Sequence, residues 1–70
     1  MNRLLHLFEK ATLIDADKNL SQDQKDLKLA RIMTEMEREY EIPMFRDDKW
    51  VVENPSIYNV YKEISNMRKL

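Results

Sequence analysis

Apolar residues recur at helical spacing in three separate stretches of this chain, and no stretch alternates convincingly between apolar and polar residues. A recurrence at i, i+3, i+4 and i+7 places side chains on one face of a helix, whereas a half-buried strand requires a period of two. The pattern predicts an all-α fold with three helices, at about residues 3–15, 22–41 and 55–68, in an up-down-up arrangement. A length of 70 residues leaves room for a single helical domain, residues 1–70.

The starts of the second and third helices carry recognisable capping signals. Ser21 and Gln24 have the spacing of a capping box, in which each side chain accepts a hydrogen bond from the other residue's backbone N–H. Asn54 followed by Pro55 predicts an asparagine cap with proline at the first helical position, where its missing N–H costs nothing. Both helices are therefore expected to begin at defined residues.

The helix ends must be made without glycine, because the chain contains none. Pro43 is expected to end the second helix, since the residue before a proline is displaced from the helical conformation. At the end of the first helix, Asn19 is the best candidate for the left-handed conformation that glycine usually takes. The absence of glycine also excludes the phosphate-binding loops of P-loop and dinucleotide-binding proteins.

Residues 42–53 connect the second and third helices and contain the only tryptophan, Trp50, together with Phe45. Such a composition is not typical of a solvated linker. We expect this segment to be partly helical, with Asp47 capping a short turn through Trp50, and to pack across the three helices. Two interpretations remain open: the segment covers the open end of the bundle, or it presents an exposed aromatic anchor to a partner.

Five methionines are a high count for 70 residues. Methionine side chains are unbranched and polarisable, so they fill irregular gaps in a core and also suit adaptable binding surfaces. Both interpretations apply to the methionines of the second helix. If the surface interpretation holds, the residues that contact a partner come from the methionine stripe and the aromatic segment. They are Met33, Met36, Tyr40, Met44, Phe45 and Trp50.

These features favour a function in protein–protein interaction. The chain is expected to be a small non-catalytic regulator or adaptor, a homodimer, or both. A three-helix chain of this size without disulfides has little stability to spare, which favours association with another protein or with a second copy. The chain has no cysteine and no apolar run long enough to span a membrane, and its first residues do not have the pattern expected of an export signal. We therefore expect a cytoplasmic protein that uses no membrane, cofactor or small-molecule substrate.

Nucleic-acid binding is the main alternative. The outward face of the third helix carries side chains able to contact phosphates and base edges. These residues are Ser56, Asn59, Lys62, Asn66 and Lys69. The formal net charge of −1, from twelve basic and thirteen acidic residues, is not the basic balance that phosphate binding exploits. A DNA-binding regulator that uses the third helix therefore comes second to a protein-binding module.

Oxygen-bearing side chains alternate between the first and second helices. They are Asp15, Asp17, Asn19, Ser21, Asp23 and Asp26, at positions 1, 3, 5, 7, 9 and 12 of a twelve-residue stretch. This stretch resembles the calcium loop of an EF-hand, and the resemblance implies a set of calcium ligands. The chain departs from the EF-hand where Leu20 replaces the glycine and where Asp26 is short for bidentate binding. Because Ser21 is also well placed as a helix cap, an ordinary capped turn is expected here.

Candidates for catalysis are few. His6 is the only histidine, and the serines fit helix caps or helix surfaces. Four glutamates stand at alternate positions of the second helix: Glu35, Glu37, Glu39 and Glu41. A spacing of two directs neighbouring carboxylates to different faces, and we expect exposed ion pairs with Arg31 and Arg38 rather than a catalytic pair. The sequence therefore predicts that the chain is not an enzyme.

Overall fold

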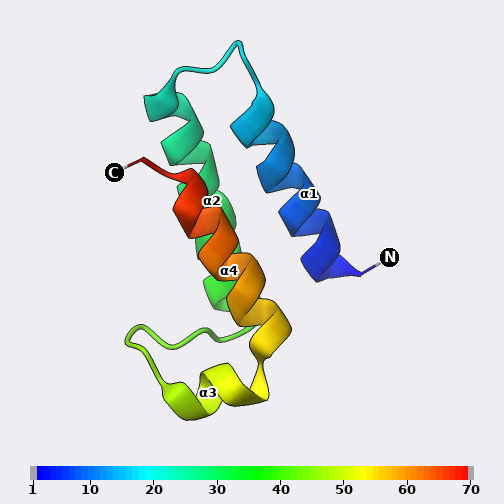
Figure 1. The fold of residues 1–70 in the computed structure, drawn as a ribbon, viewed down its shortest axis with the longest axis vertical. Coiled ribbons are helices and arrows are strands. Elements are labelled where there is room, and N and C mark those ends of the chain that lie inside the picture. Colours follow the sequence, from blue (N-terminus) through cyan, green and yellow to red (C-terminus); the bar gives the residue numbers. More distant parts are fainter. Residues whose placement is uncertain (1, 70) are drawn as a thin grey trace.

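The computed structural model describes residues 2–69, and these form four α-helices and no β-strand. The helices are α1 (Arg3–Ala16), α2 (Gln22–Glu39), α3 (Asp48–Glu53) and α4 (Pro55–Met67) (Figure 1). The expected all-α class is confirmed. The three predicted helices are present as α1, α2 and α4, and the segment that was expected to be partly helical forms a short helix of its own, α3.

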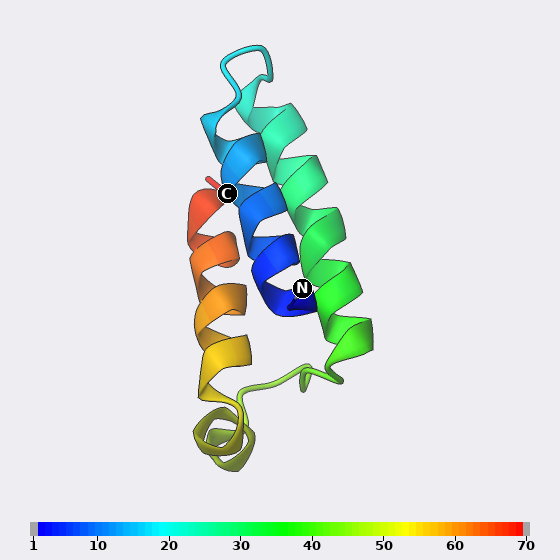
Figure 2. The same ribbon diagram turned by 90° about the vertical axis from the view of Figure 1, so that its right-hand side faces the viewer.

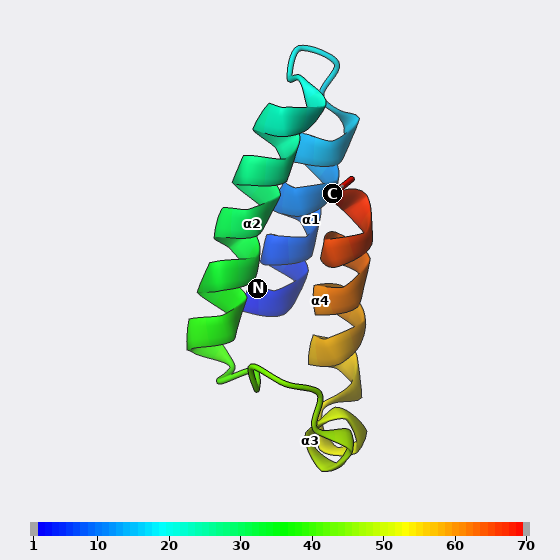
Figure 3. The ribbon, with the colours of Figure 1, turned by 90° about the vertical axis from the view of Figure 1, so that its left-hand side faces the viewer.

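The three long helices pack side by side, and the short α3 lies at one end of them (Figures 2 and 3). Each of α1, α2 and α4 contacts the other two, whereas α3 contacts only α4 among the described helices. The chain leaves the end of α2, passes through α3 and returns along α4. The expectation that the aromatic segment packs across all three helices is wrong for α3, which has no buried residue.

The core lies between the three long helices and consists of buried apolar side chains. Two come from α1, four from α2 and one from α4: Leu7, Ala11, Leu29, Ile32, Met33, Met36 and Ile64. Half-buried residues of the same helices, together with Ile42 from the loop after α2, pack against these core residues. The apolar stripes predicted from the sequence thus face one another, and their removal from water is the main force that holds the helices together.

One charged residue, Asp26, is buried on α2 with 8% of its surface exposed. Its Oδ1 atom accepts a hydrogen bond from Gln22 Nε2 at 2.8 Å and another from the backbone N–H of Lys69 at 3.1 Å. These bonds offset part of the cost of taking a carboxylate out of water. They also connect the chain that follows α4 to the first turns of α2.

The capping box at the start of α2 is confirmed. Ser21 Oγ accepts a hydrogen bond from the Gln24 N–H at 3.2 Å, and Gln24 Oε1 accepts one from the Ser21 N–H at 2.9 Å. At the start of α4 the proline is at the first helical position as predicted, but Asn54 makes no side-chain cap. Because α3 ends at the preceding residue, the Asn54 side-chain amide instead donates to the Trp50 carbonyl, 3.0 Å away.

The left-handed residue lies at the end of α2 and not at the end of α1. Glu41 has φ 51°, and no other non-glycine residue in the described chain has a positive φ. This conformation lets the Ile42 N–H donate to the Glu37 carbonyl at 3.2 Å, the bond that closes a Schellman-type helix end. The prediction for Asn19 is wrong, because its N–H donates to Asp17 Oδ1 at 2.8 Å and the turn after α1 closes without a left-handed residue.

Candidate functional site

The loop that follows α2 enters α3 through a cap that the sequence predicts. Asp47 Oδ1 accepts hydrogen bonds from the backbone N–H groups of Lys49 and Trp50, at 3.1 and 3.2 Å. Since these N–H groups have no partner inside the helix, a side-chain oxygen stabilises the first turn. The expected turn through Trp50 is confirmed.

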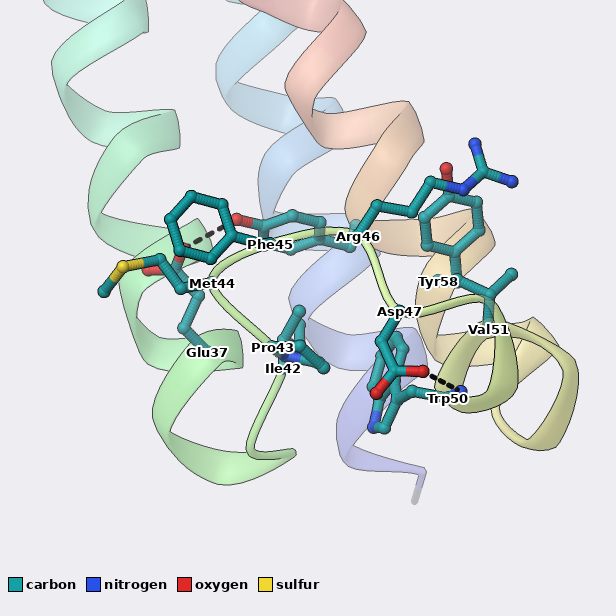
Figure 4. Close-up of a pocket in the computed structure, with 11 residues that line it drawn as sticks. Glu37, Ile42, Pro43, Met44, Phe45, Arg46, Asp47, Trp50, Val51 and Tyr58 are labelled. Atoms are coloured by element: carbon teal, nitrogen blue, oxygen red, sulfur yellow. Dashed lines mark hydrogen bonds between the residues drawn. The ribbon is translucent and has the colours of Figure 1, made fainter.

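The loop, α3 and the adjoining parts of α2 and α4 surround a groove of ≈ 410 Å³. We call it the aromatic groove, and Figure 4 shows the side chains that line it. They are Glu37, Ile42, Pro43, Met44, Phe45, Arg46, Asp47, Trp50, Val51, Tyr58 and Tyr61. Its volume lies within the range of about 300–1,000 Å³ that is typical of ligand sites.

A hydrogen bond between α4 and α2 forms one side of the aromatic groove. The Tyr61 hydroxyl donates to Glu37 Oε2 at 2.7 Å (Figure 4). Partial burial raises the pKa of Tyr61 to about 12, and the hydrogen bond to the Glu37 carboxylate adds to this shift. The phenol therefore stays protonated at neutral pH and keeps the carboxylate in place.

The remaining charged side chains of the groove lie at its exposed rim. Arg46 Nε donates to Asp48 Oδ1 at 2.8 Å, and both side chains are largely exposed to solvent. The hydrogen bond to Asp48 raises the pKa of Arg46. Arg46 is the only cation among the described lining residues, and it already has an acidic partner. The net charge of the groove is therefore negative.

Three of the six predicted contact residues meet in the aromatic groove. Met44 and Phe45 come from the loop, and Trp50 comes from α3. Met44 is 91% exposed and Phe45 is 81% exposed, whereas Trp50 is half-buried. The segment is thus neither a closed cover over the helices nor a wholly solvated anchor, because the tryptophan packs while its two apolar neighbours project into solvent.

The other three predicted contact residues lie elsewhere. Met33 and Met36 are buried in the core, where their flexible side chains fill space between the helices. They are not available to a partner, and the core-filling interpretation applies to them. Tyr40, at the end of α2, is half-buried against the core and does not line the groove.

Sequence reasoning missed three polar or aromatic residues of the groove. The sequence analysis places Glu37 among four glutamates of the second helix and does not single out Tyr61. Tyr58 was not singled out, although it stands three residues before Tyr61 on the same helix and their side chains lie near one another. The three-residue spacing of Tyr58 and Tyr61 is the only sequence feature that points to these groove residues. It does not show that the loop after α2 lies beside the two tyrosine rings.

The glutamates of α2 do separate onto different faces, but their partners differ from those expected. Arg3, at the start of α1, pairs with Glu35 at 2.9 Å and with Glu39 at 3.0 Å. Pairs with Arg31 and Arg38 do not occur among the described residues. The expected pairs are wrong, because a partner on a neighbouring helix reaches these carboxylates.

Three of the six oxygen-bearing side chains of the EF-hand-like stretch accept hydrogen bonds within the fold: Asp17, Ser21 and Asp26. Asp17 Oδ1 and Ser21 Oγ each accept a backbone N–H, and Lys25 Nζ donates to the Asp15 carbonyl at 2.9 Å. α2 begins at Gln22, inside the twelve-residue stretch. Within residues 2–69 no group of three acidic or histidine side chains has the arrangement needed to hold a metal ion.

The face of α4 that was considered for DNA is exposed as expected. Four of these residues are exposed on α4: Ser56, Asn59, Lys62 and Asn66. Lys69 is also exposed, but it lies beyond the end of α4 at Met67 and is not part of that helix face. Glu63, also exposed, stands four residues after Asn59 and therefore lies on the same face. A carboxylate within the face repels phosphate, so the structure adds no observation that favours DNA over a protein partner.

Comparison with family models, with curated proteins and with solved structures finds no match to this chain. Among the helices that the structure describes, none combines the length and the apolar character needed to cross a membrane.

Proposed function

We propose that this chain is a small, non-catalytic protein-interaction module that acts in the cytoplasm as a regulator or adaptor. The long helices α1, α2 and α4 form an up-down-up three-helix bundle in this proposal, and the aromatic groove at its end receives the partner. The observation that carries the proposal is the pair of exposed apolar side chains, Met44 and Phe45, beside a groove lined by aromatic rings.

Exposed apolar side chains next to a preformed groove favour binding, because their burial against a partner removes further apolar surface from water. Of the large apolar residues that are exposed in the described structure, three lie on the loop and α3: Met44, Phe45 and Val52. The others, Leu5, Leu13 and Leu27, lie on the long helices and line no part of the groove. A partner that binds at the end of the molecule carrying α3 therefore gains the most free energy from burying apolar surface.

The experiment is affinity purification of the tagged chain from the cells that produce it, with the double variant Met44→Ser/Phe45→Ser as the comparison. A partner that uses the groove loses about 2 kcal/mol or more when an aromatic anchor is removed, which is about 30-fold in affinity. The matched control is Leu13→Ser, which removes an apolar side chain that is 72% exposed on α1.

We expect the wild type and Leu13→Ser to recover the same partner protein in stoichiometric amount. Met44→Ser/Phe45→Ser is expected not to recover it. The complex must also form from the two purified components. Equal recovery by all three forms contradicts the proposal. Light scattering decides whether the partner is a second copy, since a dimer has twice the 8.5 kDa mass of the chain.

A further inference from the structure

The aromatic groove holds an unusual share of the aromatic side chains of this protein. The chain has six aromatic residues, and four of them line the groove: Phe45, Trp50, Tyr58 and Tyr61. They come from the loop, α3 and α4, so the tertiary structure brings them together (Figure 4). The face of an aromatic ring carries partial negative charge and attracts a cation that is placed over it.

The ionised groups of the groove add negative charge. The carboxylates of Glu37 and Asp47 belong to its lining, and the one lining cation, Arg46, is paired with Asp48. Glu37 accepts a hydrogen bond from a neutral phenol, so its charge is not cancelled by a basic partner. An occupant of the groove therefore meets four aromatic side chains and two carboxylates that have no basic partner among the lining residues.

This local balance is part of a wider separation of charge along the chain. Between residues 35 and 54 there are seven acidic and three basic residues, whereas the rest of the chain has six acidic and nine basic residues. Arg3 is the one basic residue from outside this range that pairs with the acidic group, through Glu35 and Glu39. The end of the molecule with the groove is acidic, although the net charge of the chain is only −1.

We infer that the aromatic groove binds a short peptide segment of a partner protein in which a lysine or arginine side chain is flanked by apolar residues. The inference rests on the proposed function and names the chemistry of the partner. The cationic head lies between the aromatic rings and the carboxylates of Glu37 and Asp47. The apolar flanking residues cover Met44 and Phe45.

A basic side chain matches the groove better than other occupants do. The aliphatic stem of lysine or arginine covers apolar surface while its charged end reaches the carboxylates. A wholly apolar segment would take these carboxylates further out of water without giving them a cation, which is unfavourable because their charge is then uncompensated. A phosphate-bearing ligand such as nucleic acid would be repelled by the same groups.

The test begins with a selection of short random peptides, displayed on phage, against the immobilised full chain. Synthetic copies of the enriched peptides are then titrated by fluorescence anisotropy at low and at high salt. The informative variant is Glu37→Gln/Asp47→Asn, which removes two charges and retains the oxygen atoms that accept the hydrogen bonds of Tyr61, Lys49 and Trp50. The glutamine oxygen still accepts from Tyr61, and asparagine is as good a helix cap as aspartate.

The matched control is Glu9→Gln/Glu63→Gln, which changes the net charge of the chain equally at two exposed residues outside the groove. We expect enriched peptides to carry a basic residue beside apolar ones and to bind the control as tightly as the wild type. On Glu37→Gln/Asp47→Asn their affinity falls by about three- to tenfold, and its dependence on salt decreases.

Each of the following results overturns the inference. They are peptides without an excess of lysine or arginine, equal affinity for the two double variants, and a homodimer that becomes monomeric in Glu37→Gln/Asp47→Asn. If the peptides are not basic but still lose affinity for Met44→Ser/Phe45→Ser, the inference fails and the proposed function stands. If no peptide is enriched, the inference also fails, and the affinity purification decides on the proposed function by itself.

Discussion

Glu41 is the residue at which one substitution tests the backbone geometry most directly. Its φ of 51° lies in the left-handed region, and the Schellman-type end of α2 requires that conformation. A side chain with a Cβ atom costs about 1–2 kcal/mol in this region. Glycine avoids that cost but loses about 0.4–1 kcal/mol through the greater freedom of the unfolded chain. Glu41→Gly is therefore expected to raise the free energy of unfolding, by about 0.5–1 kcal/mol from the backbone alone.

The charge of Glu41 also contributes, because a carboxylate at the C-terminal end of a helix opposes the helix dipole. Glu41→Ala is the control, since it removes the charge and retains the Cβ atom. The difference in unfolding free energy between Glu41→Gly and Glu41→Ala isolates the backbone effect.

The assay is urea unfolding of the three forms, followed by circular dichroism and fitted with a common slope. A gain of about 1 kcal/mol corresponds to a rise of about 4–8 °C in Tm for a domain of this size. If Glu41→Gly is no more stable than Glu41→Ala, residue 41 does not carry the backbone cost that the structure implies.

Two further predictions concern α4. Ile64→Ala is expected to lower the free energy of unfolding by about 2–5 kcal/mol, because this fully buried residue is the only core side chain that α4 contributes in the described chain. A loss below about 1 kcal/mol in urea unfolding would show that α4 is not packed as described. The pKa of Tyr61 is about 12 in the folded protein, against an ordinary value of 10.0. As the pH rises, the phenol of the unfolded chain therefore ionises before that of the folded protein, and the free energy of unfolding falls between pH 10 and pH 12. Tyr61→Phe should weaken this fall, as measured by unfolding at several pH values, and an unchanged pH profile would contradict the assignment.

The helix starts could be predicted because they depend on residues that are close together in the sequence. Ser21 and Gln24 are three residues apart, and the Asp47 cap spans the same short distance. Asn54 shows the limit of this reasoning. An asparagine before a proline has the right composition for a cap, but the helix that ends just before it offers a carbonyl to its amide instead.

The candidate site could be predicted only in part. Met44, Phe45 and Trp50 were identified because an irregular segment rich in apolar residues is unusual. Glu37 and Tyr61 were not identified as a pair, because 24 residues separate them and only the packing of α4 against α2 brings them together. Amphipathic spacing indicates that a helix has a buried face, but it does not indicate which residues of another helix that face will meet.

The sequence by itself determined that the chain is helical, where most of its helices begin, and that its apolar stripes form a core. These properties follow from hydrogen bonds and side-chain contacts within a few turns of chain. Only the tertiary structure decided that Met33 and Met36 are core residues, that Arg3 pairs with two glutamates of α2, and that four aromatic rings share a groove. Each of these depends on the direction in which the chain leaves α2 and on the faces that α1 and α4 present to it. That direction is set by contacts between residues distant in sequence, which no local pattern records.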